Sequence, residues 1–331
     1  MINKKLNLSP KIFKRDIEMK ATRDGFGEGL VEAGRNNEKV VGLSADLSDS
    51  VRVSLFKKEF PERYIEVGVA EQALVTIASG MAAYGKIPFA ASYAIFSPGR
   101  NWEQIRTTIA FNNVPVKIVG GHAGITVGPD GATHQALEDI ALMRVLPRMV
   151  VLSLSDAVES KKAVLAAMDN GKPTYLRLSR TDSPVFTTEK TPFEIGKAEI
   201  YWESRDPKVA IIATGPLLYE ALNAARKLSK SKINSLVINC HTIKPMDEQA
   251  IIKAAKIAGA IVTVEDHQMT GGLGSAIAEV LAKNFPVPME FVGVNDQYGE
   301  SGNPRELIKK FGLTSEDIIS ASKRVIRRKN N

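Results

Sequence analysis

The chain has 331 residues, of which 44% are hydrophobic and 24% are charged, and Cys240 is its single cysteine. This length predicts two domains and this composition predicts a buried core, which excludes a disordered chain, a fibre and a coiled coil. We expect no disulfide framework, no membrane span, which would need about 18 apolar residues, and no signal peptide, so a cytoplasmic location is favoured.

The excess of basic residues does not predict a nucleic-acid surface. Lys and Arg outnumber Asp and Glu by 44 to 37, a net charge of +7. Part of the excess is the stretch 323–329 and the rest is dispersed, whereas nucleic-acid binders gather such charge on one face. We expect a solvated terminus, with some of the other cations meeting anionic small molecules.

Short apolar runs alternate with longer segments of helical periodicity along the chain. The expected strands are 40–44, 89–91, 116–120, 149–152, 173–178, 209–213, 235–238, 260–264 and 289–292. The clearest expected helices are 71–84, 102–112, 155–168 and 218–229. Because the strand runs are continuously apolar, they are typical of parallel strands buried on both faces. The sequence therefore predicts an α/β protein.

A turn-rich stretch at 181–192 divides the chain. We expect two domains, each a mostly parallel sheet flanked by helices. The predicted organisation is an N-terminal extension or docking arm at 1–20, a first domain at 21–185, a linker at 186–200, a second domain at 201–322 and a basic tail at 323–331.

Two motifs are better explained by structure than by chemistry. Residues 271–275, Gly-Gly-Leu-Gly-Ser, precede a helix but lack the spacing of known nucleotide loops, so a tight turn is favoured over a phosphate site. Cys240 and His241 are sequence neighbours on an expected strand, where neighbours point to opposite faces. A buried, inert thiol is favoured over a Cys/His catalytic pair.

The stretch 121–135 has the highest density of chemically active residues. It follows an expected buried strand and contains His122, Asp130 and His134 among several glycines. Open α/β sheets bind ligands at the carboxyl ends of their strands. The spacing matches no standard metal site, so polar groups that grip hydroxyls and an anion are favoured over a metal centre or a purely structural loop.

Two further features lie near expected strand ends. Glu71 starts an apolar helix, where it either complements the helix dipole or acts as a buried acid/base group whose pKa burial raises. Tyr93 and Phe96 are spaced three apart after a strand, as core residues or as a stacking surface.

Taken in order, these features resemble one family. Residues 20–320 resemble the C-terminal half of transketolases, with the patterns Ala-Thr-Arg at 21–23, Ser-Ala-Asp-Leu at 44–47, Gly-Val-x-Glu at 68–71, Gly-x-Asp-Gly-x-Thr-His-Gln at 128–135 and Leu-Ser-Arg at 178–180. The resemblance implies a pyrimidine-binding domain and a C-terminal domain. It also implies transfer of a two-carbon ketol unit between sugar phosphates in pentose phosphate carbohydrate metabolism, with thiamine diphosphate as cofactor.

The resemblance also implies residue roles. The catalytic residues are expected to be Glu71, which matches the glutamate that hydrogen-bonds N1′ of the cofactor's aminopyrimidine, and His134. Cofactor contacts are expected from Glu71, Phe96, Tyr93 and Asp46. Substrate contacts are expected from Arg23, Ser50, His122, Asp130, His134 and Arg180. Gly99 stands where many relatives have a third aromatic residue, so that wall of the pocket is expected to differ.

Sibling families remain as alternatives. 1-Deoxyxylulose-5-phosphate synthases share Glu71 and the Asp-Gly-x-Thr-His-Gln motif, and Ala70-Glu71-Gln72 leans toward them, but their loop before Asp130 is shorter. The β subunits of 2-oxo acid dehydrogenases share the architecture without this loop. A binding or regulatory protein that retains the fold is the alternative of another class.

The diphosphate end of the cofactor is expected to lie on another chain. Transketolases hold the Mg²⁺ of thiamine diphosphate with a Gly-Asp-Gly motif and a later Asn, and Gly-Asp-Gly does not occur in this sequence. No metal ligand is therefore expected in this chain. The resemblance implies an N-terminal transketolase subunit as partner, in a heterotetramer of two copies of each chain, with neither nucleic acid nor membrane as partner.

Overall fold

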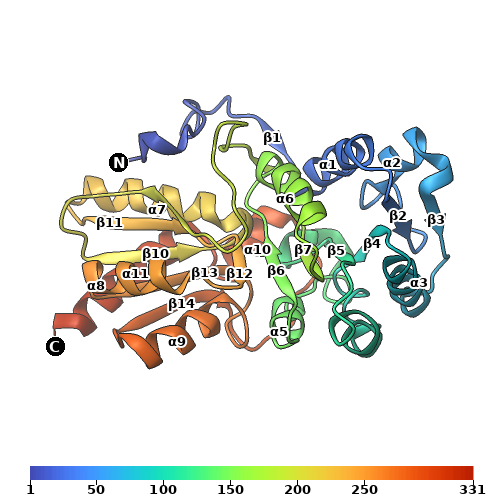
Figure 1. Cartoon of the computed structure of the whole chain (residues 1–331). Helices are drawn as coiled ribbons and strands as arrows, with labels where there is room; N and C mark the ends of the chain where they lie inside the picture. Colours follow the sequence, from blue (N-terminus) through green and yellow to red (C-terminus); the bar gives the residue numbers. More distant parts are fainter. Residues whose placement is uncertain (331) are drawn as a thin grey trace.

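The computed structural model describes residues 1–330, with side chains through residue 329. Two α/β domains lie side by side, the first from the blue and green part of the chain and the second from the yellow to red part (Figure 1). The helices are α1 (Thr22–Asn36), α2 (Val53–Glu59), α3 (Glu71–Ala83), α4 (Trp102–Gln104), α5 (Asp139–Arg144), α6 (Ala157–Asp169), α7 (Leu218–Lys230), α8 (Glu248–Ala258), α9 (Leu273–Asn284), α10 (Pro304–Lys310) and α11 (Ser315–Asn330).

The strands are β1 (Met19–Lys20), β2 (Val40–Ser44), β3 (Tyr64–Glu66), β4 (Ile87–Tyr93), β5 (Lys117–Gly121), β6 (Val150–Ser153), β7 (Thr174–Arg177), β8 (Ser183–Pro184), β9 (Glu199–Trp202), β10 (Val209–Ala213), β11 (Ser235–Asn239), β12 (Thr242–Lys244), β13 (Ile261–Gln268) and β14 (Met289–Val294). Short 3₁₀ turns are η1 (Lys4–Leu6), η2 (Pro61–Arg63), η4 (Ile125–Asp130) and η5 (Gly215–Leu217), and η3 (Ile105–Ala110) is π-helical.

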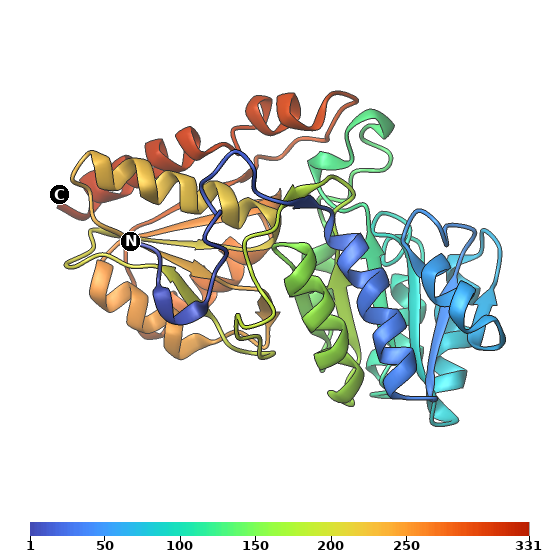
Figure 2. The same ribbon diagram turned by 90° about the horizontal axis from the view of Figure 1, so that it is seen from above.

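The first sheet has the order β12-β6-β7-β5-β4-β2-β3 and is parallel apart from β12. Successive residues of one strand enter different cores, as the pleat requires: Val40 packs with α1 and α6, whereas Val41 packs with α3. Helices therefore cover both faces (Figure 2). The predicted mostly parallel α/β architecture is confirmed.

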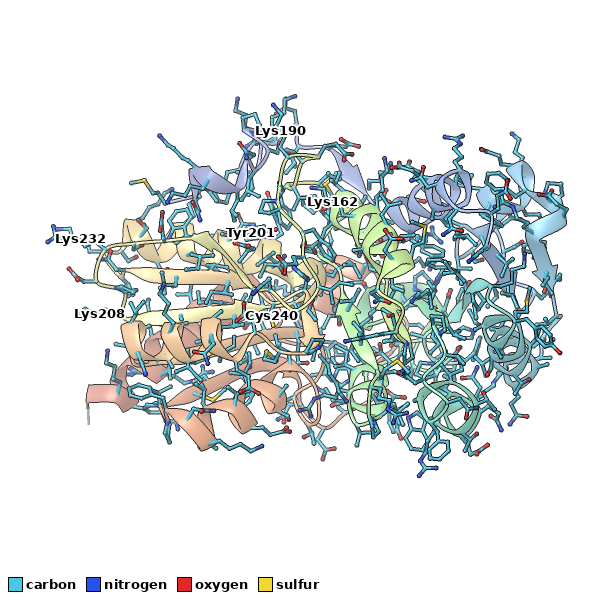
Figure 3. The ribbon with its side chains drawn as sticks, viewed as in Figure 1. Lys162, Lys190, Tyr201, Lys208, Lys232 and Cys240 are labelled. Carbon is cyan, nitrogen blue, oxygen red and sulfur yellow. The ribbon has the colours of Figure 1, made fainter. Side chains whose placement is uncertain are left out.

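The second sheet has the order β14-β13-β10-β11-β9, with only β9 antiparallel. α7 and α11 cover one face, and α8 and α9 cover the other. Cys240, labelled in Figure 3, follows β11 and is buried with its pKa raised to about 12 by desolvation. A thiol with this pKa is inert at neutral pH.

The boundary between the domains is crossed by chain from both ends. β12 follows β11 of the second sheet but pairs with β6 at the edge of the first sheet. The N-terminal arm packs Leu6 and Ile12 into the core of the second domain, and β1 pairs with β8. The first 20 residues thus dock on this same chain.

Two local expectations differ from the structure. Residues 323–330 are the last turns of α11 rather than a solvated tail; Val325 is buried, and Arg324 and Arg328 pair with Glu290. Residue 331 lies outside the described residues. The expected helix over 102–112 is α4 followed by the π-helix η3, in a region where Thr107 and Thr108 donate to the carbonyls four residues earlier, a bond known to distort helices.

Candidate active site

Most of the residues singled out in the sequence follow strands of the first sheet at one edge. They come after β2 (Asp46, Ser50), at or after β4 (Tyr93, Phe96), after β5 (His122, Asp130, His134) and after β7 (Arg180), while Arg23 and Glu71 begin α1 and α3. Because these four strands are parallel and paired as neighbours, their carboxyl ends meet. The topology thus gathers loops that are far apart in sequence.

Glu71 is a buried carboxylate at the start of α3. Its side chain is 4% exposed, and its Oε2 accepts a hydrogen bond from Arg100 Nη1 at 3.1 Å. The Glu71 carbonyl accepts another from Asn101 Nδ2 at 2.7 Å, which ties the helix start to the loop after β4. Because buried carboxylates need partners, Arg100 explains how an acidic group is tolerated here.

Aromatic rings connect Glu71's neighbourhood to the loop after β5. Tyr93 and Phe96 are nearly parallel, with ring centroids 5.9 Å apart. His122 stacks on Tyr93 at 3.8 Å, and the half-buried His134 meets Phe96 edge-on at 5.5 Å. Two histidines from one loop therefore lie against one aromatic pair.

Arg100, the residue after Gly99, lies over the Phe96 ring. Its guanidinium carbon lies 4.1 Å from the Phe96 ring centroid, a cation–π contact. Sequence reasoning named Gly99 as a missing aromatic and overlooked the next residue. The sequence could have pointed to Arg100, because a planar guanidinium stacks on rings as an aromatic side chain does.

A positively charged group of side chains lies beside His122. Arg23 donates to the Ser50 carbonyl at 2.9 Å, and its Nε is buried without a partner. Burial and then the neighbouring Arg52 lower the pKa of Arg23, with a smaller contribution from Arg180. Sequence reasoning missed Arg52, which pairs with Asp24.

Burial and the same positive charges lower the pKa of His122. Burial, followed by Arg23 and Arg180, lowers the pKa of His122 to about 3, so the ring is neutral at physiological pH. Its Nδ1 is buried and has no partner. Three arginines, Arg23, Arg52 and Arg180, thus act on an imidazole whose Nδ1 is unpartnered, while Arg52 pairs with Asp24 and Arg180 lies near Asp130. This excess of positive charge suits an anionic ligand.

Asp130 and Asp46 lie at the margins of this group. Asp130 Oδ1 is 3.6 Å from Arg180 Nη1, and both side chains are about one-third exposed (32% and 36%). Asp46 is exposed in the turn after β2, where its backbone N–H donates to Glu66 Oε1 at 2.7 Å. The contacts described above connect the other predicted site residues but do not include the Asp46 side chain.

The described residues contain neither a metal site nor a nucleotide loop. Within residues 1–330, no group of three or more His, Cys, Asp and Glu side chains could hold a metal ion, and no helix is both long and apolar enough to cross a bilayer. The glycine turn at 271–275 has a structural explanation, because Glu265 accepts the N–H groups of Leu273 and Gly274 at 2.7 and 2.8 Å. The free N–H groups at the start of α9 are thus already bonded to the Glu265 carboxylate.

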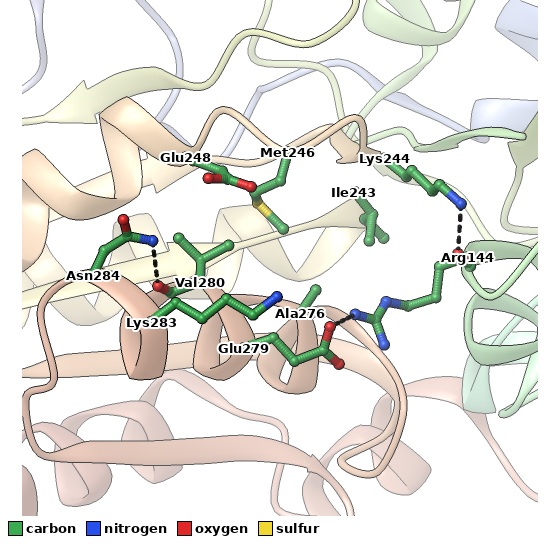
Figure 4. Close-up of a pocket in the computed structure, with 10 residues that line it drawn as sticks. All are labelled: Arg144, Ile243, Lys244, Met246, Glu248, Ala276, Glu279, Val280, Lys283 and Asn284. Atoms are coloured by element: carbon green, nitrogen blue, oxygen red, sulfur yellow. Dashed lines mark hydrogen bonds and ion pairs between the residues drawn. The ribbon is translucent and has the colours of Figure 1, made fainter. Parts of the chain in front are cut away.

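One cavity lies between the domains, away from the predicted residues. It has a volume of about 240 Å³ and is lined by α5, β12 and α8–α9 residues, and Arg144 reaches Glu279 across it at 2.8 Å (Figure 4). None of the predicted site residues lines it. This ion pair joins the two domains at a distance from the predicted residues.

Comparisons with known proteins agree with this arrangement. Residues 18–185 match the transketolase pyrimidine-binding domain, and residues 196–318 match the transketolase C-terminal domain. A Methanocaldococcus jannaschii protein described as a putative transketolase C-terminal section is 44% identical over 302 residues, 90% of this chain and 94% of that one. A Clostridium 6-deoxy-6-sulfo-D-fructose transketolase subunit, SqwH, is 39% identical over 96% of this chain and 98% of its own length.

Structural similarity leads to the same family. A solved split-gene transketolase, described as an inactive beta4 tetramer, superposes with a TM-score of 0.87 at 42% identity and covers 93% of this chain and 99% of that one. Human transketolase is 35% identical over 92% of this chain, which spans only 49% of the human protein. The chain therefore belongs to the transketolase family, as a C-terminal-type subunit with the pyrimidine-binding and C-terminal domains.

Proposed function

We propose that this chain is the C-terminal subunit of a two-subunit transketolase that moves a two-carbon ketol unit between anionic sugars, with thiamine diphosphate as cofactor. The observation that carries the proposal is the pairing, at one sheet edge, of a buried carboxylate beside an aromatic face with a positively charged group around His122. The first suits an aminopyrimidine and the second suits a phosphate.

The residues present fit the pyrimidine end of the cofactor. Arg100 contacts both the Phe96 ring and the Glu71 carboxylate, which brings these two groups to one place, and Ser92 Oγ and Asn101 Oδ1 are buried nearby in sequence without partners. Thiamine diphosphate, when bound, supplies the chemistry that cleaves and forms a bond next to a carbonyl. In this proposal Glu71 holds a proton at pyrimidine N1′ and Phe96 and Tyr93 orient the ring.

The substrate side is assigned to the loops after β5 and β7. His122 and Arg180, with Arg23 and Ser50, would bind the terminal anion of the sugar, and Asp130 and His134 would hydrogen-bond its hydroxyls. Such groups give strong discrimination, because a substrate that lacks the matching hydroxyl leaves them buried and unpaired. The Mg²⁺–diphosphate site is assigned to an N-terminal partner subunit.

The terminal anion of the sugar could be a phosphate or a sulfonate. One relative is named for a sulfonated sugar, 6-deoxy-6-sulfo-D-fructose, whereas a Phocaeicola vulgatus relative at 36% identity is an apulose-4-phosphate transketolase subunit. Arginine binds both sulfonate and phosphate, so the positive group here accommodates either. We propose sugar phosphates as the substrates.

Reconstitution tests the function directly. The chain is combined with an N-terminal transketolase subunit from the same organism, thiamine diphosphate and Mg²⁺, and ketol transfer is measured with phosphorylated, sulfonated and uncharged ketoses. Transfer from the phosphorylated donors supports the proposal. A cofactor-loaded complex that transfers from no ketose, or that condenses pyruvate with glyceraldehyde 3-phosphate instead, would refute it.

A further inference from the structure

The second domain packs against the loop at 122–135, here called the substrate loop. α10 lies against η4 within it, so the red end of the chain covers a green segment of the first domain (Figure 2). None of the side chains assigned to substrate comes from the second domain.

Asp266 of the second domain holds the start of the loop. It lies on β13, is 6% exposed, and its Oδ1 accepts the Ile125 N–H at 2.9 Å. Gly124 approaches so closely that a Cβ there would lie 2.0 Å from Asp266 Oδ2. Arg177 in turn donates to the Asp266 carbonyl at 2.7 Å, which fixes the backbone that carries the carboxylate.

Gln135 binds the backbone carbonyl of Ile125, the residue whose N–H is held by Asp266. Its Nε2 donates to the Ile125 carbonyl and to the Glu300 carbonyl of the second domain, both at 3.0 Å. The side chain is 2% exposed, and its Nε2 is committed to these two carbonyls rather than to ligand. Both backbone polar groups of Ile125 are thus satisfied by side chains at the domain boundary.

Residues 301–302 of the second domain contact the chain on both sides of Asp130. The Gly302 N–H approaches the Gly128 carbonyl at 3.4 Å, and a Cβ on Gly131 would lie 2.5 Å from Ser301 Oγ. Both glycines have positive φ, 78° and 74°, which other residues rarely adopt. The loop shape on either side of Asp130 therefore depends on close contact with residues 301–302.

We propose that Asp266 and Gln135 are positioning residues, through which the C-terminal domain fixes the substrate loop so that His122, Asp130 and His134 face the substrate. The inference rests on the proposed function for its kinetic consequence but not for its structural one. It gives the C-terminal domain a specific part in substrate binding without any direct contact with substrate.

The structural arm measures amide hydrogen exchange in the full chain. Asp266→Ala removes the acceptor of the Ile125 N–H, and Gln135→Leu removes the donor to two carbonyls. We expect exchange of residues 124–135 to accelerate about tenfold, as loss of a buried hydrogen bond implies, while the second sheet is unchanged. Asp266→Asn retains one acceptor oxygen and should restore most of the protection.

The kinetic arm uses the reconstituted complex. Both removal variants should raise KM for the anionic sugar about tenfold with a smaller effect on kcat, and Asp266→Asn should recover much of the loss. Glu279→Gln, which removes the charge from the Arg144–Glu279 contact between the same domains, is the control and should change neither quantity.

The two arms separate the possible failures. Exchange and KM equal to those of Glu279→Gln would overturn the positioning role, as would protection lost evenly over the whole chain. A wild-type complex without ketol transfer would refute the proposed function, yet the exchange result would still decide whether Asp266 and Gln135 hold the loop.

Discussion

Arg100 and Glu71 form an ion pair at the start of α3, with Arg100 Nη1 3.1 Å from Glu71 Oε2, although Arg100 itself is half exposed. The same guanidinium covers a face of Phe96. One cation therefore contacts both groups that we assign to the aminopyrimidine. Because a guanidinium is planar and donates N–H bonds, it satisfies the carboxylate and the ring face together.

Glu71→Gln should abolish ketol transfer and leave the fold intact. Glutamine has the same size and can still contact Arg100 and start α3, but it cannot exchange a proton with the pyrimidine. General acid–base groups contribute roughly 10²–10⁴-fold, so kcat should fall by at least about a hundredfold at an unchanged unfolding temperature. Glu103→Gln on α4, which alters an exposed carboxylate, is the matched control. Full activity of Glu71→Ala at wild-type cofactor occupancy would disprove the assignment.

Arg180→Ala and His122→Ala should act mainly on substrates that carry a terminal anion. Loss of a hydrogen bond to a charged group costs about 1.5–3 kcal/mol, which corresponds to a rise in KM of about ten- to a hundredfold. Donors without phosphate should be nearly unaffected. Because Arg180 also donates to the Val127 carbonyl at 2.8 Å, Arg180→Lys shows whether charge alone suffices. Equal losses on both substrate types would mean that these residues do not bind the phosphate.

The loops of this site were predictable, but several of their partners were not. The glycine-rich sequence at 121–135 lies after a buried strand, and the edge where parallel strands end is a general ligand site. Arg52, by contrast, reaches Arg23 only because α2 folds back beside α1, and its sequence context gives no sign of this. Single residues acquire such neighbours from tertiary packing.

Contacts between the second domain and the first were likewise not predictable from the sequence. Residues 242–244 were not an expected strand, because three residues of mixed polarity carry no periodic signal, and they pair with β6 of the other sheet. Asp266 follows an apolar run, so the sequence suggests only that the strand ends there. In the structure its carboxylate accepts the N–H of Ile125, which is 141 positions earlier in the chain. Periodicity predicts the elements, whereas contacts between domains require the three-dimensional structure.

His122 should make stability depend on pH in a defined direction. Its pKa is lowered to about 3 in the folded chain against about 6.5 in an unfolded chain. Below pH 6.5 the unfolded state binds a proton that the native ring refuses, so this contribution is complete above pH 6.5 and is lost as pH falls toward 3. Relative to His122→Asn, wild type should lose up to about 1.4 kcal/mol of unfolding free energy per pH unit over this window. NMR titration of the ring should show it neutral at pH 5; protonation there would contradict the assignment.

Asp156→Ala should destabilise the chain without a direct effect on the site. The buried Asp156 caps α6 by accepting the Glu159 N–H, and it also accepts the N–H groups of Phe186 and Thr187 and the Thr187 hydroxyl. Removing this acceptor leaves several buried donors unpaired, so we expect a loss of about 3 kcal/mol in chemical denaturation. Asp169→Ala, at the exposed end of the same helix, should cost less than about 0.5 kcal/mol. Similar values for the two variants would show that Asp156 does not join α6 to the linker.

The chain without its partner should neither bind thiamine diphosphate tightly nor transfer ketol units. The charges of the cofactor are on its diphosphate, and residues 1–330 contain no acidic or histidine cluster suited to the accompanying Mg²⁺. Large apolar side chains are exposed around α3, with Val69 at 70%, Ile77 at 40%, Tyr84 at 93% and Phe111 at 77%. Exposed apolar patches of this kind mark interaction surfaces, and obligate interfaces are the more apolar ones.

We therefore expect two copies of this chain and two partner chains to assemble around α3, with two-fold symmetry. Calorimetry of the chain alone should detect no Mg²⁺-dependent cofactor binding at micromolar concentration, and adding the partner should restore binding and turnover. Ile77→Asp and Tyr84→Asp should weaken assembly in size-exclusion chromatography, whereas Tyr298→Asp, at an equally exposed tyrosine (86%) of the second domain, should not. Robust ketol transfer by the single chain would exclude the two-subunit enzyme, and assembly unaffected by both α3 variants would place the partner on another surface.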